Sequence, residues 1–340
     1  MAAVIHPIPP GTRDVLPDEK RELRRLEAAL CSVFDAHGYG EVATPTIEYD
    51  EVLARGDGRH ASAAYRFFDE RGDLLALRSD MTIPIARLAA NRFAAEQGPL
   101  RFFYCSTAYR AVRPQRGQMR EFTRAGVELI GVPAPEGSAE VIGVLGEALD
   151  AVGLERAVIG LGDADLYRQL LAELGVDEAA RSSFLERLAA HDLVGLESQL
   201  AELGTIGDSD IETLLALSQL RGPPEVLEQA HDLGGEAVER ATSRIQATWE
   251  ALAGTPVADR VQIDLGLLRD LGYYSGAIVE VYDPAVGHIL GGGGRYDSLL
   301  ARFGRDLPAA GFALYLERLH VAQAEEEKAE GGQQAAGEAG

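Results

Sequence analysis

The chain has 340 residues, of which 46% are hydrophobic and 25% are charged, and this is the composition of a globular protein with a large core. Its 54 acidic and 32 basic side chains give a net charge of −22, which repels nucleic-acid phosphates unless a local basic patch overrides the field. No apolar run approaches the length of a membrane span, and the scattered histidines form no HExxH motif or His/Cys cluster that would favour a metal site.

The two cysteines and the N-terminal residues indicate the cellular compartment in which we expect the protein. Cys31 and Cys105 belong to no CxxC pair, and buried free thiols in a reducing compartment are the simpler interpretation. The first residues, MAAVIHPIPPGTRD, have neither the basic start nor the long apolar run of a secretory signal. We therefore expect a cytoplasmic protein that binds no metal and no cofactor.

The first predicted helix begins near residue 18, after an extended Pro/Gly-rich segment. Its apolar stripe consists of Leu23, Leu26, Leu30, Val33 and Phe34. Gly38 can end this helix. Pro45 lies inside the β-like run that follows, and because proline cannot donate to a strand ladder, this run is predicted to be an edge or interface strand.

A hairpin is predicted around Arg71-Gly72, followed by a short loop and a helix over residues 83–95. The loop is Ser79-Asp80-Met81-Thr82. Asp80 and Thr82 can cap the following helix, because short polar side chains accept hydrogen bonds from the first backbone N–H groups.

The stretch 101–131 carries the most informative pattern. Two apolar, β-prone runs, 102–109 and 122–130, flank a polar turn and predict two antiparallel strands. One face of the second strand carries Phe122, Arg124, Gly126, Glu128 and Ile130, because side chains alternate along a strand. Charges of both signs on such a face indicate that they pair or meet a ligand. Edge strands also carry solvated charges, so the spacing alone leaves both interpretations open.

The middle of the chain is predicted to be mainly helical. A helix over 138–152 and a strand over 157–163 come first, with Asp163 as the N-cap of the next helix. Residues 177–253 are rich in Leu, Ala and Glu with helical periodicity, and we interpret them as a helical insertion whose charges are solvated.

β-character returns at 261–266 and 273–283. The glycine run at 291–294 fits neither a phosphate loop nor a dinucleotide fingerprint, and it is predicted to open a helix. Residues 323–340 are acidic and of low complexity, which predicts a disordered tail.

The central stretch resembles the second signature motif of class II aminoacyl-tRNA synthetases, in the form found in histidyl-tRNA synthetases. In YRAVRPQRGQMREFTRAGVELIG the elements Arg-Pro-Gln, Arg-Glu-Phe and Val-Glu-x-Ile-Gly fall in register. The run containing Pro45 resembles the first motif, whose proline lies at the dimer interface. AAGFALYLERL resembles the third, with Arg318 at the arginine that binds the ATP γ-phosphate. The resemblance covers roughly residues 8–320.

This resemblance implies an α+β fold: a class II synthetase-like core with a mixed, mainly antiparallel sheet flanked by helices, plus a helical insertion. The expected divisions are a first core part over 1–153, a mainly helical insertion over 154–256, a second core part over 257–322 and the acidic tail over 323–340.

The resemblance also implies a pocket of the size of histidine. The loop containing Asp80 matches the one that grips the substrate's α-amino group, and Arg110 matches the arginine that holds a phosphate and a carboxylate. LLRDLGYYSG resembles the histidine-specific motif, whose tyrosines line the imidazole pocket. The residues expected around histidine are Asp80, Thr82, Arg110, Arg124, Glu128, Arg269, Tyr273 and Tyr274.

Five positions depart from the synthetase pattern. Val112 replaces a glutamate that contacts ATP, and Gln118 replaces an arginine of the motif 2 loop. Gly272 stands where an acid precedes the two tyrosines, and Tyr315 stands where the family has a small residue. Arg124 replaces a glutamine that helps to bind histidine. An arginine accepts no hydrogen bond and repels an α-ammonium group unless a nearby carboxylate, from Glu128 or Asp80, neutralises it.

These departures, and the absence of the anticodon-binding domain that follows the third motif in synthetases, resemble the regulatory subunits of ATP phosphoribosyltransferase. That resemblance implies a chain with no catalytic residues, which forms homodimers around Pro45 and partners a short-form catalytic subunit in the first step of histidine biosynthesis. It implies activation of the transferase and feedback inhibition by histidine, and it makes tRNA an unlikely partner. The alternative is a catalytic histidyl-tRNA synthetase-like or amino-acid adenylating enzyme, favoured by Arg110, Arg269 and Arg318. A purely structural homodimer is a third interpretation.

Overall fold

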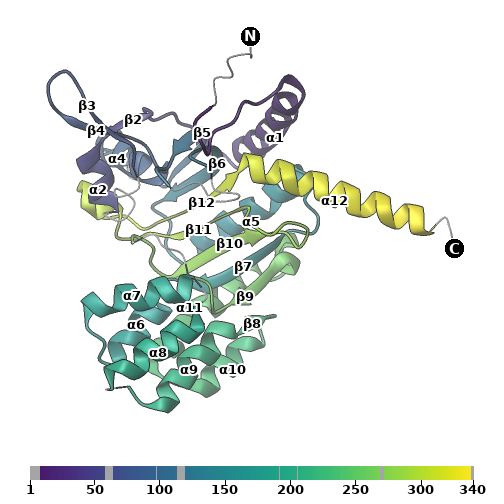
Figure 1. Cartoon of the computed structure of the whole chain (residues 1–340). Helices are drawn as coiled ribbons and strands as arrows, with labels where there is room; N and C mark the ends of the chain where they lie inside the picture. The colour runs from purple at the N-terminus through teal and green to yellow at the C-terminus, as the bar shows by residue number, and fades with distance from the viewer. Residues whose placement is uncertain are drawn as a thin grey trace, which may run out of the picture.

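A nine-stranded sheet forms the centre of the molecule (Figure 1). The computed structural model describes residues 8–57, 64–96, 98–112, 119–190, 192–204, 206–268 and 272–337. In spatial order the strands are β1 (Gly40–Glu41), β5 (Leu100–Tyr109), β6 (Glu121–Ile130), β12 (Ala309–Tyr315), β11 (Gly291–Arg295), β10 (Ala277–Tyr282), β7 (Val158–Asp163), β9 (Val261–Asp264) and β8 (Arg221–Gly222). Only the β1–β5 and β7–β9 pairs are parallel, which confirms the mixed, mainly antiparallel sheet.

A second, smaller sheet has the order β2 (Ile47–Tyr49), β4 (Leu74–Leu77) and β3 (Arg66–Phe68), and all its pairs are antiparallel. Gly72 forms the turn of the predicted hairpin with φ +86°, a conformation that glycine adopts without steric cost. Pro45 is exposed in the segment just before β2, an edge strand of this sheet, so it precedes the strand in which we expected it.

The helices of the core cover both faces of the large sheet. α1 (Pro17–Ala36) and α5 (Glu136–Ala151) pack on one face, while α2 (Asp50–Gly56), α4 (Thr82–Arg92) and the short helix η2 (Leu300–Phe303) lie on the other. The predicted stripe of α1 is buried at Leu23, Leu26, Leu30 and Phe34. Gly38 follows the helix with φ +76° and donates its N–H to the carbonyl of Asp35, as predicted.

The predicted alternation of β6 separates two apolar cores. Ala125, Val127 and Leu129 belong to the core beneath α1 and α5. Ile130, with Tyr104 of β5, belongs to the core beneath α4. Since Arg124 and Glu128 share the parity of Ile130, they project on the α4 side, and this face is where the polar cluster described below is buried.

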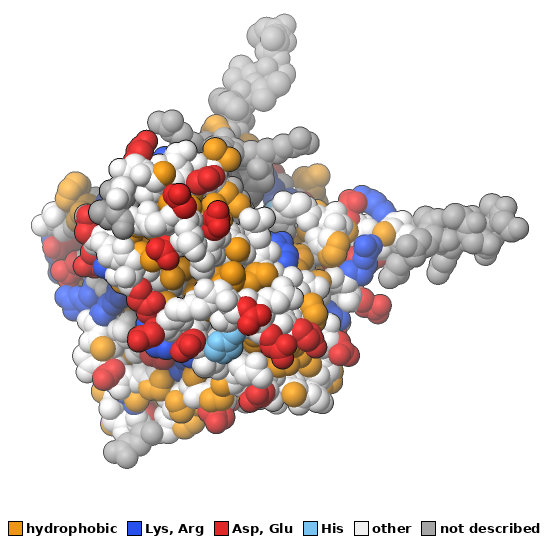
Figure 2. Space-filling model, turned by 90° about the horizontal axis from the view of Figure 1, so that it is seen from below, with side chains coloured by type: hydrophobic (Ala, Val, Ile, Leu, Met, Phe, Trp, Pro, Cys, Tyr) orange, Lys and Arg blue, Asp and Glu red, His pale blue; other side chains and the backbone are white. Residues whose placement is uncertain are grey.

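A helical group lies at the β8 end of the sheet. It comprises α6 (Leu166–Glu173), α7 (Glu178–Ala189), α8 (Leu193–Leu203), α9 (Asp208–Gln219), α10 (Val226–Leu233) and α11 (Glu236–Leu252), and the short helix η1 (Pro256–Arg260) leads back to β9. The range 154–256 also contains β7 and β8, two strands of the large sheet. Seen from this side, the surface carries more acidic than basic side chains (Figure 2).

Two predictions in this region are wrong. Asp163 is not the N-cap of α6, because that position is Asp165. Asp163 ends β7, and its carboxylate accepts the Asp165 N–H at 2.9 Å and also Nε and Nη2 of Arg244 in α11, at 2.7 and 2.8 Å. Arg244 is therefore no solvated charge of a helix face. A buried carboxylate is costly without a cation, and Arg244 supplies that cation to Asp163.

The glycine run also differs from its prediction, because it forms β11 instead of opening a helix. A Cβ atom on Gly293 would lie 2.0 Å from the carbonyl oxygen of Gly311 in β12. Only residues without side chains let the two strands approach this closely.

The acidic end of the chain is helical as far as Gly337 in α12 (Leu316–Gly337), whereas we expected disorder from residue 323. Alanine, glutamate and glutamine have high helix propensity. Leu319, Ala322 and Glu326 are buried at helical spacing, because this part of α12 packs on the core.

Glu326 binds α12 to the segment before β7. Its side chain is only 3% exposed, and its two oxygens accept the backbone N–H groups of Glu155 and Arg156, each at 3.1 Å. Burial, and then the neighbouring Asp283 carboxyl, raise the pKa of Glu326 to about 7.

We expect the melting temperature to decrease as the pH is raised from about 5 to about 8, and to decrease less in Glu326→Gln than in the wild type. The unfolded chain loses this proton near the ordinary pKa, whereas the folded chain keeps it to about pH 7, so the folded state is destabilised as the pH rises. Thermal unfolding followed by circular dichroism at several pH values measures the slope. The exposed neighbour Glu327→Gln is the control, and an unchanged slope in Glu326→Gln would contradict the prediction.

Candidate functional site

Side chains from four segments form a buried polar group, which we call the inner cluster. It consists of Asp80, Thr82, Arg124, Glu128, Tyr273, Tyr274 and Tyr296. Apart from the half-buried Thr82, these residues are at most 7% exposed. They come from the start of α4, from β6, from the turn before β10 and from the end of β11.

Glu128 lies at the centre of the inner cluster. Thr82 donates its hydroxyl to Oε1 at 2.7 Å, and the Tyr296 hydroxyl donates to Oε2. Burial raises the pKa of the Glu128 carboxyl to about 8, and the charge of Asp80 adds to this, although the two hydrogen bonds and Arg124 act in the opposite direction. Gly311 of β12 is paired with Glu128 on the neighbouring strand, and a Cβ on Gly311 would lie 2.1 Å from Oε2 of Glu128.

Two buried atoms of the inner cluster have no hydrogen-bond partner among the described residues: Oδ2 of Asp80 and Nε of Arg124. The other oxygen of Asp80 accepts the N–H of Ile83 at 3.1 Å, as predicted for a side chain that caps α4, whereas the Thr82 hydroxyl donates to Glu128 instead. A buried polar atom without a partner costs about 1–3 kcal/mol. An acceptor and a donor in this state together suit a ligand that carries both an ammonium and a carboxylate group, such as an amino acid.

Three tyrosine rings form the aromatic side of the inner cluster. The ring centroid of Tyr273 lies 5.1 Å from that of Tyr274 and 5.9 Å from that of Tyr296, the latter edge to face. Burial holds the pKa values of Tyr273 and Tyr296 well above their usual range, so their hydroxyls keep their protons and can donate.

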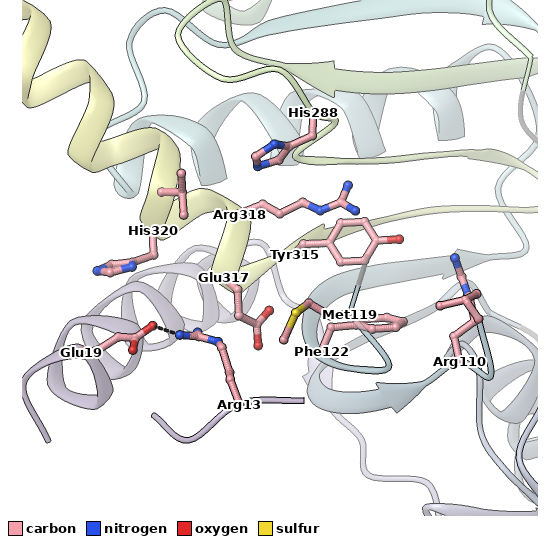
Figure 3. A pocket seen from close by; sticks show the side chains of 12 residues that line it. Arg13, Glu19, Arg110, Met119, Phe122, His288, Tyr315, Glu317, Arg318 and His320 are labelled. Atoms are coloured by element: carbon pink, nitrogen blue, oxygen red, sulfur yellow. Dashed lines mark hydrogen bonds and ion pairs between the residues drawn. The ribbon is translucent and has the colours of Figure 1, made fainter. Parts of the chain in front are cut away.

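A cavity of about 420 Å³, which we call the outer cleft, lies outside the inner cluster. Figure 3 shows the side chains that line it. Its walls carry Arg13, Glu19, Arg110, Val112, Met119, Phe122, His288, Tyr315, Glu317, Arg318, His320 and Val321. Figure 3 shows Tyr315 between Arg318 and Phe122. Burial lowers the pKa of Arg318, but a guanidinium remains charged at any physiological pH.

Tyr315 connects the outer cleft to the inner cluster. The guanidinium carbons of Arg318 and Arg124 lie 4.2 and 4.6 Å from the centroid of its ring, and the Phe122 ring lies at 5.4 Å. Arg124 also donates from Nη2 to the Tyr315 hydroxyl at 2.9 Å. Within the described part of the chain, the guanidinium of Arg124 thus hydrogen-bonds this hydroxyl and neither Glu128 nor Asp80.

The structure brings most of the predicted residues together and separates one. Six of the eight belong to the inner cluster. Arg110 instead lines the outer cleft, with its guanidinium 5.6 Å from the Phe122 centroid. Arg269, and Gln118 of the motif 2 loop, lie outside the described residues. Sequence reasoning missed Tyr296, although its position two residues after the glycine run, in the motif GGRYD, is a usable signal.

Within the described part of the chain, no helix is long and apolar enough to cross a membrane. The same residues contain no group of three or more His, Cys, Asp or Glu side chains that could hold a metal ion.

The chain is similar to known proteins over nearly its whole length. The family model described as histidyl-tRNA synthetase matches residues 11–319. The ATP phosphoribosyltransferase regulatory subunit of Symbiobacterium thermophilum is 43% identical, over 93% of this chain and 79% of the relative. That of Moorella thermoacetica is 40% identical, over 94% of this chain and 82% of the relative.

Two solved structures share the fold. The ATP phosphoribosyltransferase regulatory subunit/histidyl-tRNA synthetase of Bacillus halodurans superposes with a TM-score of 0.87 at 30% identity, covering 95% of this chain and 84% of that one. A histidine–tRNA ligase subunit of Alicyclobacillus acidocaldarius gives 0.82 at 32% identity, covering 96% and 100%. The chain therefore belongs to the histidyl-tRNA synthetase-like family of class II fold that includes the regulatory subunits of ATP phosphoribosyltransferase.

Proposed function

We propose that this chain is the regulatory, non-catalytic subunit of a cytoplasmic ATP phosphoribosyltransferase. It activates the short-form catalytic subunit in the first step of L-histidine biosynthesis and takes part in feedback inhibition by histidine. The names of relatives at 40–43% identity support this proposal. A tRNA partner is disfavoured by the net charge of −22.

The position of Tyr315 is the observation that carries the non-catalytic role. The resemblance assigns the cleft between Arg110 and Arg318 to ATP, and in this chain a tyrosine ring stacks on Arg318 inside that cleft. A nucleotide entering it would have to displace a ring that is held by two guanidinium groups and a hydrogen bond. Val112, on the same wall, offers no side-chain hydrogen bond to the nucleotide.

Histidine is the proposed ligand of the inner cluster. Its carboxylate would pair with Arg124, its ammonium group with Asp80 and Glu128, and its imidazole would lie beside Tyr273 and Tyr274. The buried partnerless atoms of Asp80 and Arg124 support this orientation. Thr82 would hold Glu128. Arg269 stays in the proposed set, whereas Arg110 lines the outer cleft and is left out of it.

Homodimerisation is proposed through the region around Pro45. The neighbouring small sheet exposes apolar side chains, including Phe68 at 71%, together with Ile47 and Tyr49. Exposed apolar groups gathered on one sheet favour a protein interface. Light scattering that gives a monomer mass at micromolar concentration would contradict this part of the proposal.

The proposal is tested by assaying the short-form catalytic subunit with and without this chain, across a histidine titration. We expect transferase activity to rise on addition of the chain and to fall again as histidine is added. No effect of the chain on the transferase would overturn the regulatory role.

A catalytic adenylating enzyme is the second candidate. Two observations favour it: Arg110 and Arg318 line one cleft, and one similar structure is named as a histidine–tRNA ligase subunit. ATP–pyrophosphate exchange with histidine distinguishes the candidates, because sustained exchange requires an adenylate intermediate and would contradict the non-catalytic role.

A further inference from the structure

We propose that Arg124 and Tyr315 form a switch through which a ligand carboxylate in the inner cluster changes the shape of the outer cleft. The inference rests on the proposed function, since it takes an amino acid as the ligand of the inner cluster. It adds a route by which occupation of a buried site is transmitted toward the surface.

Tyr315 contacts the inner cluster and also lines the outer cleft. It lies opposite Arg124 in the register of β12 and β6, so the two side chains are direct cross-strand neighbours. Its hydroxyl accepts from the buried guanidinium of Arg124, whereas its ring lines the outer cleft and stacks on Arg318. A movement of this one ring therefore alters the wall of the outer cleft.

Arg124 is arranged so that a carboxylate competes with Tyr315. Nε and Nη2 form one edge of the guanidinium group, and a carboxylate binds this edge most strongly with two parallel hydrogen bonds. In the structure Nη2 donates to Tyr315 at 2.9 Å, while the buried Nε has no partner among the described residues. A carboxylate drawn to Nε therefore reaches the donor that holds Tyr315.

The electrostatic hold on the ring weakens at the same time. The guanidinium of Arg124 attracts the ring face as a cation, at 4.6 Å from its centroid. A carboxylate paired with Arg124 neutralises that charge, so this attraction weakens, whereas the contacts of the ring with Arg318 and Phe122 are unaffected. Ligand binding and ring position are then linked, and by reciprocity whatever moves the ring changes the affinity for the ligand.

The test uses the full chain labelled with 3-fluorotyrosine and followed by ¹⁹F NMR during a histidine titration, with calorimetry in parallel. Tyr315→Phe identifies the Tyr315 resonance by its loss. Tyr282→Phe identifies the control resonance. The Tyr282 hydroxyl donates to Gln262 of β9, toward the β8 end of the sheet and away from the β6–β12 pair that carries Arg124 and Tyr315. We expect the Tyr315 resonance to shift with the same midpoint as the calorimetric binding, and the Tyr282 resonance to remain in place.

Tyr315→Phe provides the second readout. Because this variant keeps the ring and loses only the competing hydroxyl, we expect it to bind histidine about 2- to 10-fold more tightly than the wild type. Calorimetric binding without a shift of the Tyr315 resonance, and with equal affinity in Tyr315→Phe, would overturn the switch and leave the proposed function standing. Absence of calorimetric binding to the wild type would overturn both the switch and the proposal that histidine binds the inner cluster.

Discussion

Replacing Glu128 with glutamine is expected to weaken histidine binding by about 10- to 100-fold, because a charge-assisted hydrogen bond contributes about 1.5–3 kcal/mol. The carboxyl group of Glu128 is held by Thr82 and Tyr296, so it is already oriented before a ligand arrives. Glutamine has nearly the same shape, but it offers the ammonium group no negative charge. Isothermal titration calorimetry measures the affinity, and the histidine concentration that half-inhibits the transferase should rise by the same factor.

The pH dependence provides an independent check on Glu128. The empty site holds a proton on this carboxyl up to about pH 8, whereas a bound ammonium group favours the ionised form. Binding therefore expels this proton near pH 7, and its contribution to affinity weakens as the pH falls below 8. Calorimetry in buffers of different ionisation enthalpy should count a released proton in the wild type that is missing in Glu128→Gln.

Glu147→Gln is the matched control for this experiment, because Glu147 lies on α5 with an exposed side chain that pairs with His37 at the surface. It should bind histidine like the wild type. If Glu128→Gln does so as well, histidine binds elsewhere in the protein.

Replacing Gly293 with alanine is expected to lower stability by at least about 3 kcal/mol, at the upper end of the usual cost of overpacking. The new Cβ would meet the carbonyl oxygen of Gly311 at 2.0 Å and the Cα of Phe312 at 2.6 Å. Both atoms belong to the backbone of β12, a central strand that also positions Gly311 against Glu128. Neither can move without breaking the ladder, so we expect a melting temperature lower by roughly 5–10 °C.

Gly143→Ala is the control for the glycine experiment. A Cβ at Gly143 of α5 would meet no atom within 4 Å, and alanine is favoured over glycine in a helix by about 1 kcal/mol. Thermal unfolding of both variants by circular dichroism gives the comparison. Equal melting temperatures would mean that β11 and β12 are spaced more widely than the structure has them.

Much of the fold follows from local sequence patterns. The structure confirms the apolar stripe of α1, the hairpin turn at Gly72 and the alternation along β6. Each of these features is determined by residues that lie close together in the sequence. Local pattern fails at the glycine run, where no side chain reports whether the segment is helix, turn or strand. It also fails in α12, because a low-complexity composition conceals the contacts that order its first half.

The residues of the candidate site were also predictable only in part from the sequence. The sequence by itself determined the charged face of β6, and the resemblance placed Asp80, Thr82, Tyr273 and Tyr274 beside it, since motif positions carry over residue by residue. Only the tertiary structure decided that Arg110 belongs to the outer cleft. It also decided that Arg124 bonds Tyr315, a residue 191 positions away. Alternation says which face a side chain occupies, but pairing between distant strands and the cost of burying charge select its partner.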